Sequence, residues 1–264
     1  MSTGIQARLA RLGRDGAYVT VPMDHGITMG AVDGLKDIEG TIDAVTEGGA
    51  DAVLTQKGIA DRVIPNRNDA GYIVHLNGST EIGPDEADKR QTATVEEAVR
   101  VGADAVSFHI NVGSDHEPDQ IAALGEVTEA AHRLGIPVLA MAYARGPGID
   151  EYDAGNLGHA VRLAEELGAD LIKTAYSGDP DSFSHVVEST ARPVIIAGGS
   201  PSGDRATLEN VRDAMAAGGA GVSMGRTIFQ HPDPYAISSA VAAVVHEGLS
   251  VDAAMDRFDL PVEP

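Results

Sequence analysis

The sequence predicts an α/β protein built as one (β/α)8 barrel, or TIM barrel. Short, fully apolar segments alternate along the chain with amphipathic helical segments, as expected for a parallel sheet covered by helices on its outside. A unit in which a helix ends at a glycine and an apolar strand follows recurs along the chain. The length of 264 residues fits one barrel of about 250 residues.

The expected strands follow in order from these patterns. The first covers residues 18–23, where apolar and β-branched side chains dominate. The repeated unit supplies further strands at residues 49–54, 102–107, 168–173 and 219–224. Its glycine can adopt the left-handed conformation that ends a helix. Segments 72–76, 136–141 and 193–197 complete the set, and a proline closes the loop before each of the last two.

Helices are expected at residues 33–47, 94–101, 118–134 and 156–167. The segment 58–71 shows no clear period and is expected to be irregular. We expect a single domain over residues 1–264, with a short N-terminal helical segment at about 1–15 and C-terminal helices at about 233–258. A doubly wound open sheet is the competing fold, but it would usually carry a glycine-rich dinucleotide loop after the first strand, which Met23-Asp24-His25-Gly26 is not.

The composition excludes several classes of function. The chain has 19 basic and 40 acidic side chains, so its net charge is 19 − 40 = −21, which opposes binding to nucleic acid. Excess carboxylate with only four lysines indicates a source that lives in concentrated salt. No apolar run is long enough for a membrane span and the start lacks an apolar signal segment, so we expect a cytoplasmic protein. The absence of cysteine excludes thiol chemistry.

Polar side chains occur where nearly every expected strand ends. In a barrel of this kind the C-terminal ends of the strands form the active site. The residues at these ends, in chain order, are Asp24 and His25, Gln56 and Lys57, His75 and Asn77, His109 and Asn111, Tyr143 and Arg145, Lys173 and Tyr176, Gly198 and Gly199, and Gly225 and Arg226. Any one of them could be an ordinary rim residue, so the joint pattern indicates the site.

Lys173 is the most informative of these residues, because it lies in the apolar strand Leu171-Ile172-Lys173-Thr174. A buried amine loses its charge easily and becomes a nucleophile toward carbonyls, which predicts a Schiff base. The alternative is a lysine paired with a buried carboxylate. We expect Asp24 to shuttle protons on the substrate and Tyr143 to exchange a proton with the enamine carbon. Asp24 could instead be the ion-pair partner of Lys173, and Tyr143 a wall of the pocket.

The last two strands end in residues that suit a phosphate group. Gly198, Gly199 and Gly225 let the backbone approach a ligand, and Arg226 adds a guanidinium beside a short expected helix. A phosphate cradle next to a nucleophilic lysine predicts a phosphorylated sugar whose carbonyl becomes an iminium. The alternative for each glycine is a tight turn.

Three histidines, His25, His75 and His109, end strands and could in principle hold zinc in a metal-dependent aldolase. No His-x-x-x-His pair supports a metal site, and a lysine nucleophile needs no Lewis acid. We therefore expect no metal and no cofactor, and assign His25 and His109 to substrate contact. A silent phosphosugar-binding subunit is a further alternative, although it would not need lysine, tyrosine and aspartate together.

Runs that extend over nearly the whole chain resemble the archaeal-type class I aldolase family. They are residues 21–26, 103–114, 141–146, 173–179, 197–199 and 225–230. The resemblance implies that Lys173 forms the Schiff base, Tyr143 transfers protons, Asp24 acts as acid and base, and the glycines with Arg226 bind phosphate. Position 144 holds alanine where the family usually has proline. The absence of proline should loosen the loop that carries Arg145.

The resemblance also implies the partners: a phosphorylated ketose donor, an aldehyde acceptor and further copies of the chain in a homo-oligomer. Two reactions remain open at this point, transfer of a three-carbon unit between substrates and cleavage by a class I fructose-1,6-bisphosphate aldolase. Lys57 or Arg145 could hold either a second phosphate or the carboxylate of an acceptor.

Overall fold

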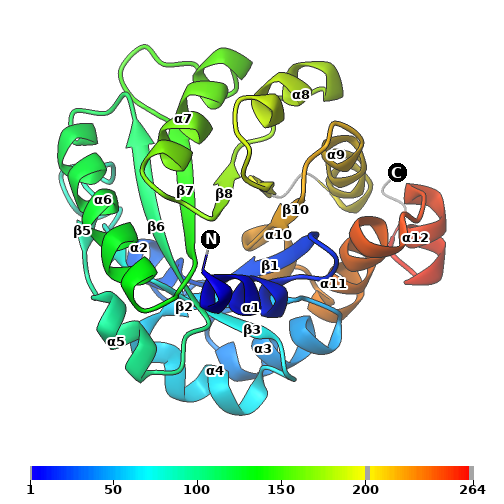
Figure 1. The fold of residues 1–264 in the computed structure, drawn as a ribbon. Helices are drawn as coiled ribbons and strands as arrows, with labels where there is room; N and C mark the ends of the chain where they lie inside the picture. The colour runs from blue at the N-terminus through cyan, green and yellow to red at the C-terminus, as the bar shows by residue number, and fades with distance from the viewer. Residues whose placement is uncertain (1, 200–202, 262–264) are drawn as a thin grey trace.

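Eight parallel strands close into a barrel in the computed structural model, which describes residues 2–199 and 203–261 (Figure 1). Around the barrel the order is β1-β10-β9-β8-β7-β6-β3-β2. The strands are β1 (Tyr18–Pro22), β2 (Ala52–Gln56), β3 (Gly71–His75), β6 (Ala105–Val112), β7 (Val138–Ala144), β8 (Leu171–Thr174), β9 (Val194–Ala197) and β10 (Gly221–Ser223). The predicted fold class is confirmed, and every expected strand is present.

Alternate side chains of each strand face the inside of the barrel. Leu171 of β8 belongs to the inner apolar cluster, whereas Ile172 packs in the outer cluster between strands and helices. Lys173 is in register with Met141 of β7 and Ile195 of β9, which both belong to the inner cluster. Because paired residues of neighbouring strands point to the same side of a sheet, Lys173 faces inward.

Helices form a ring outside the strands (Figure 1). They are α3 (Ile38–Glu47), α4 (Ala60–Asn66), α5 (Val95–Arg100), α6 (Glu117–Arg133), α7 (Ala154–Glu166), α8 (Pro180–Glu188), α9 (Asp204–Ala216) and α11 (Pro234–Ala242). The four helices predicted from the sequence are confirmed, although the first begins at Ile38 rather than near Asp33. Within residues 2–199 and 203–261, no helix is long and apolar enough to cross a membrane.

The prediction of an irregular segment at residues 58–71 was wrong. A 3₁₀ turn, η1 (Lys57–Ile59), leads into α4, which buries Ala60 and Val63. Pro65 lies inside this helix. A helix of only seven residues shows two buried positions, and a proline argues against a helix, so the pattern was too short to recognise.

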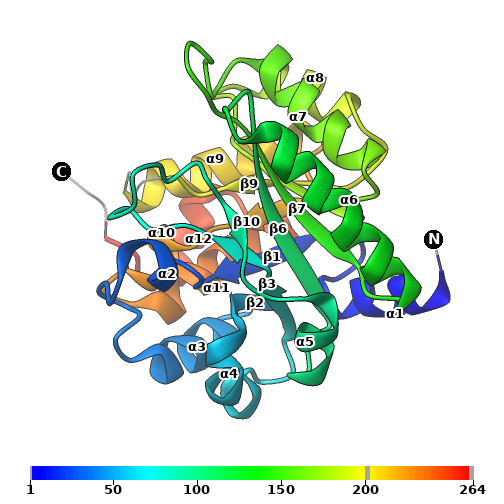
Figure 2. The ribbon, with the colours of Figure 1, turned by 90° about the vertical axis from the view of Figure 1, so that its left-hand side faces the viewer.

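The two ends of the barrel differ. At the N-terminal end, α1 (Thr3–Leu12) places Leu12 in the inner cluster together with Tyr18 and so closes the barrel floor. Figure 2 shows α1 at one end and the short helices α2 (Gly26–Met29) and α10 (Arg226–Phe229) at the other. The chain finishes with the π-helical turn η2 (Ala243–Glu247) and α12 (Val251–Arg257) on the outside. Only the end that carries α2 and α10 is therefore open to substrates.

The aspartates of the repeated Gly-Ala-Asp unit join neighbouring strands. Each carboxylate accepts the backbone N–H of an early residue in the strand beside its own: Asp51 from Val19 at 2.8 Å, Asp104 from Tyr72 at 3.0 Å and Asp170 from Val138 at 3.1 Å. All three also contact basic side chains: Asp51 lies 2.8 Å from Arg14, Asp104 lies 2.8 Å from Arg11, and Asp170 lies 3.0 Å from His132. The aspartate of each unit therefore joins two neighbouring strands, while the glycine of the unit ends a helix.

Candidate active site

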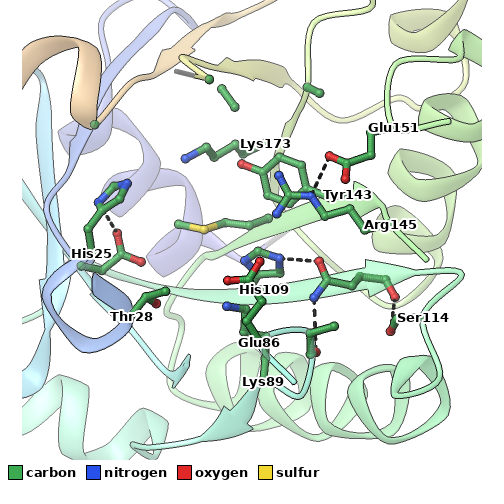
Figure 3. A pocket seen from close by; sticks show the side chains of 18 of the residues that line it. His25, Thr28, Glu86, Lys89, His109, Ser114, Tyr143, Arg145, Glu151 and Lys173 are labelled. Carbon is green, nitrogen blue, oxygen red and sulfur yellow. Dashed lines mark hydrogen bonds and ion pairs between the residues drawn. The ribbon is translucent and has the colours of Figure 1, made fainter. Parts of the chain in front are cut away.

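A cavity of about 1110 Å³ lies at the C-terminal ends of the strands. The strand-end residues Asp24, His75, His109, Tyr143 and Lys173 line it. Two further segments wall the opening: α2, and the connection between β3 and β6, which contains the small hairpin of β4 (Asn77–Gly78) and β5 (Arg90–Gln91). The barrel thus brings together side chains that lie as far apart in the sequence as His25 and Lys173 (Figure 3).

Lys173 reaches into this cavity from β8 (Figure 3). Lys173 is only 6% exposed. Beside it, Thr174 Oγ1 donates a hydrogen bond to the Ala142 carbonyl at 2.8 Å, and this bond holds β8 against β7. None of the ion pairs in the described part of the chain includes Lys173, although Asp24 is close enough for their charges to interact. The alternative of a lysine locked to a buried carboxylate is therefore not what the structure shows.

Asp24 lies between two histidines at the start of the connection after β1. Its Oδ1 is 3.6 Å from His25 Nδ1, and its Oδ2 is 3.7 Å from His75 Nε2. Burial raises the pKa of Asp24, but the charges of His75 and His25 when protonated, together with Lys173, outweigh that effect, so the pKa lies below its ordinary value. Asp24 is therefore an ionised carboxylate at neutral pH, able to accept a proton.

His75 is held by the strand next to its own. A hydrogen bond of 2.7 Å joins His75 Nδ1 to Ser107 Oγ of β6, and the residue is almost fully buried. Burial lowers the pKa of His75, while Asp24 opposes this. With Nδ1 occupied, the remaining nitrogen Nε2 faces Asp24. His75 thus positions Asp24, and burial keeps the His75 ring neutral at neutral pH.

His25 packs against the other side of the site. Its ring meets Phe229 of α10 edge to face, with the centroids 5.1 Å apart. Burial lowers the pKa of His25, and Asp24 partly restores it. A Cβ on Gly225 would lie 2.5 Å from His25 Cε1 and 2.7 Å from the Pro22 carbonyl. Glycine at position 225 is therefore required by the packing of His25.

Tyr143 stands two residues beyond Met141, so it faces the cavity on the strand beside Lys173. The guanidinium carbon of Arg145 lies 4.4 Å from the centroid of its ring, and the ring of His109 lies at 5.1 Å. Arg145 N donates to the Val112 carbonyl at 2.9 Å, and its side chain pairs with Glu151 at 3.0 Å. These two contacts hold the loop after Ala144.

His109 presents one defined nitrogen to the cavity. Asn111 Nδ2 donates to the Ala87 carbonyl at 3.3 Å, so Asn111 Oδ1 is left to accept from His109 Nε2 at 2.8 Å. Burial, together with Lys89 and Arg145, holds the pKa of His109 well below its ordinary value. The neutral ring therefore carries its proton on Nε2 and leaves Nδ1 as a hydrogen-bond acceptor.

The predicted cradle residues Gly198, Gly199, Gly225 and Arg226 all line the cavity. Arg226 Nη2 donates to the Gly199 carbonyl at 3.3 Å, which links the ends of β9 and β10. Gly199 has φ +66° with open space around it, a conformation that favours glycine. The structure therefore assembles a cationic turn at this point of the rim.

Lys57 does not line the cavity, which corrects its proposed role in binding a second anion. Its Nζ lies 2.9 Å and 3.0 Å from the two carboxylate oxygens of Glu97. Glu97 also completes the capping box of α5 with Thr94. This carboxylate, fixed at the start of a helix, draws Lys57 to the outside of the barrel.

Lys89 lines the cavity in its place, and the sequence did not point to it. It precedes β5, and its Nζ donates to Ser79 Oγ at 2.8 Å. Burial lowers the pKa of Lys89, while Glu86 beside it raises the value. The only signal in the sequence was a lysine in a polar segment, which is usually a solvated loop residue.

No three histidine, aspartate or glutamate side chains of the described ranges are arranged so that they could hold a metal ion. One ring nitrogen of His75 is engaged by Ser107, and one ring nitrogen of His109 is engaged by Asn111.

Comparisons with known proteins identify aldolases and related synthases as similar to this chain. A family model described as DeoC/LacD family aldolase matches residues 18–231. The chain is 68% identical over 260 residues, 98% of each chain, to "2-amino-3,7-dideoxy-D-threo-hept-6-ulosonate synthase" of Halobacterium salinarum, a relative that supports the expected salt-loving source. It is 39% identical to "2-amino-4,5-dihydroxy-6-oxo-7-(phosphonooxy)heptanoate synthase" of Streptomyces griseus, over 86% of this chain and 84% of that protein.

Among solved structures, an archaeal fructose-1,6-bisphosphate aldolase "with the catalytic Lys covalently bound to the carbinolamine intermediate" superposes with a TM-score of 0.85 at 30% identity. The match covers 91% of this chain and 99% of the other.

Proposed function

The chain belongs to the DeoC/LacD family of aldolases, and from this premise we propose that it is 2-amino-3,7-dideoxy-D-threo-hept-6-ulosonate synthase, a transaldolase that forms a Schiff base on Lys173. The proposal is carried by the amine of Lys173, which faces the cavity with no ion-pair partner among the described residues, in a chain 68% identical to a protein of that name. The solved relative with a carbinolamine on its catalytic lysine supports the same chemistry.

The name of the product defines its two halves. The product is an aldol, with a ketone at C6 beside C5. An aldolase therefore forms the bond between C4 and C5. Carbons 1–4 come from L-aspartate 4-semialdehyde, and carbons 5–7 from a three-carbon unit that ends in a methyl group. The donor is 6-deoxy-5-ketofructose 1-phosphate, and the product enters an alternative route to 3-dehydroquinate and the aromatic amino acids.

The first half-reaction breaks the donor. Lys173 Nζ adds to the C5 ketone, and loss of water gives an iminium. The C3 hydroxyl then loses its proton, the electron pair of the C3–C4 bond moves into the iminium, and a three-carbon enamine remains on Lys173. The departing fragment is a phosphorylated aldehyde. Asp24 is the group that accepts protons in these steps, because it lines the cavity and its lowered pKa keeps it ionised at neutral pH.

The second half-reaction reverses these movements on a new aldehyde. The enamine carbon attacks C4 of the semialdehyde, the new alkoxide takes a proton, and the iminium forms again. Water then releases the product and the free amine. Tyr143 lies on the strand beside Lys173 and supplies the hydroxyl for proton exchange at this face. For transfer to succeed, the enamine carbon must meet an aldehyde before it takes a proton.

A class I fructose-1,6-bisphosphate aldolase is the second candidate, favoured by the solved neighbour of that activity. Such an enzyme protonates the enamine and releases it, so no acceptor is needed. Both candidates use Lys173, Tyr143 and Asp24 in the same places.

Borohydride reduction followed by mass spectrometry distinguishes the two. With 6-deoxy-5-ketofructose 1-phosphate, we expect an adduct on Lys173 and a product that forms only when the semialdehyde is supplied. Rapid release of triose phosphate from fructose 1,6-bisphosphate alone would instead identify the aldolase. No adduct with either donor would rule out the imine mechanism.

We also propose that the protein works in the cytoplasm as a homo-oligomer, in keeping with the family resemblance. Multi-angle light scattering at high salt tests this assembly, and a monomer at all concentrations would contradict it.

A further inference from the structure

Four cationic side chains line the cavity: Lys89, Arg145, Lys173 and Arg226. Lys173 is the nucleophile of the proposed reaction, Arg226 at the start of α10 donates to the Gly199 carbonyl after β9, and Arg145 is already paired with Glu151 at 3.0 Å. Lys89 alone has no role, and no ion pair of the described residues includes it; its one hydrogen bond goes to the neutral Ser79. Its charge is therefore available to a ligand.

The closed barrel places Lys89 across the opening from Arg226. Lys89 lies in the connection between β3 and β6, which are neighbours in the barrel. Three steps separate this pair of strands from β9 and β10 in either direction around the ring, through β7 and β8 on one side and through β2 and β1 on the other. A chain-like substrate that spans the opening thus passes Lys173 and Tyr143 on one side and Asp24 on the other.

Lys89 is held in place by the connection that carries it. The Ala87 carbonyl accepts hydrogen bonds from Gln120 at 2.6 Å and from Asn111 at 3.3 Å, which fasten this segment to α6 and β6. Ser79 Oγ also donates to the Glu86 carbonyl at 2.6 Å. In Figure 3, Lys89 and Glu86 lie side by side below His109, on the opposite side of the cavity from Lys173.

We propose that Lys89 binds the carboxylate of the acceptor and that Glu86 binds its ammonium group, so that this wall of the cavity selects an α-amino-acid aldehyde. The inference rests on the proposed function. An acceptor with adjacent carboxylate and ammonium groups matches a lysine beside a glutamate, because each charge meets its opposite.

Two chemical relations support this place for the acceptor. The departing and entering aldehydes bond to the same enamine carbon, so they occupy the same part of the cavity in turn. The fragment that departs carries a phosphate and the one that enters carries a carboxylate, so both need a cation there. The Streptomyces griseus relative is named for a product with the same 2-amino acid end and a phosphonooxy group on C7. The two products thus differ at C7, the end away from the acceptor.

The test compares acceptors that lack one charge each. We expect Lys89→Met to lower the ratio of kcat/KM for L-aspartate 4-semialdehyde over 3-aminopropanal, which lacks the carboxylate, by about tenfold or more, because a charge-assisted hydrogen bond is lost. Glu86→Gln should lower the ratio of the semialdehyde over 4-oxobutanoate, which lacks the ammonium group. Both ratios are measured in competition for one enamine, so effects on the donor cancel.

The matched control is Lys36→Met, because Lys36 is exposed and pairs with Asp33 at 2.7 Å outside the cavity. It should leave both ratios unchanged. If Lys89→Met lowers kcat/KM equally for all three acceptors, Lys89 has only a structural role and the inference is wrong. Lys89→Arg should restore part of the selectivity if charge is the cause. Failure to trap donor on Lys173 in the wild type would instead refute the proposed function.

Discussion

Asp24 Oδ2 lies 3.7 Å from His75 Nε2, and the other nitrogen of that imidazole is hydrogen-bonded to Ser107 Oγ at 2.7 Å. The carboxylate proposed to move protons is thus supported by a side chain from β3 that is itself fixed by β6. Removal of His75 would leave Asp24 with His25 as its remaining histidine neighbour.

The acid limb of the pH profile should depend on His75. The charge of His75 lowers the pKa of Asp24, and this influence is exerted in the acid range where the imidazole holds a proton. In His75→Asn the pKa of Asp24 should rise, so the acid limb of kcat/KM should move to higher pH. Ser107→Ala should shift it less, in the same direction. An unmoved limb in His75→Asn would show that another group controls it.

Stability should fall as the pH drops below 6.5, partly because of His109. Its pKa in the folded protein lies well below the ordinary value of 6.5. The unfolded chain therefore binds a proton first, and protonation below pH 6.5 favours unfolding. Thermal unfolding between pH 5 and 8 should show this decline, and His109→Asn should flatten it. An equally steep decline in the variant would assign the effect to other groups.

Lys173→Ala should reduce transfer to background, because no other cavity lysine lies on β8. Tyr143→Phe should slow turnover roughly 10²-fold while the imine stays detectable, since general acid–base catalysis contributes on that order. Activity is measured with the semialdehyde, and the imine by borohydride reduction. A chelator should leave the wild-type rate unchanged. Substantial activity in purified Lys173→Ala would contradict the imine mechanism.

The effect of replacing Arg226 on KM should depend on whether the unit retained on Lys173 carries a phosphate. With fructose 1,6-bisphosphate the retained unit bears a phosphate, so Arg226→Ala should raise KM about tenfold or more through loss of a charge-assisted bond. With 6-deoxy-5-ketofructose 1-phosphate the retained unit ends in a methyl group, so the rise should be smaller. Equal KM values for variant and wild type with the bisphosphate would remove Arg226 from the cradle.

The strand tie made by Asp170 should contribute measurably to stability. Asp170→Ala leaves the buried N–H of Val138 without its acceptor, which should cost about 1–3 kcal/mol of unfolding free energy. Asp170→Asn keeps an acceptor oxygen and should cost less. Urea denaturation at constant salt measures both, with the exposed Asp33→Ala as control. A loss no larger than that of Asp33→Ala would show that the tie is not stabilising.

The sequence by itself determined the barrel and the rim on which its chemistry lies. Apolar strands that alternate with amphipathic helices pack in few ways, and a closed parallel barrel brings the C-terminal ends of all its strands to one face. Lys173, Tyr143 and Asp24 could be placed at this opening for this reason, since each lies at or near the C-terminal end of an expected strand. These patterns are local, so they can be recognised in short stretches of the sequence.

Only the tertiary structure decided which charges in the connections reach the cavity. Lys57 and Lys89 look alike in the sequence, yet Glu97 at the start of α5 draws Lys57 outward, while the β4–β5 hairpin turns Lys89 inward. The same holds for Asp170, whose partner Val138 lies in β7, outside the repeated unit. Such contacts join segments far apart in the chain, and their geometry is set by packing that no local pattern contains.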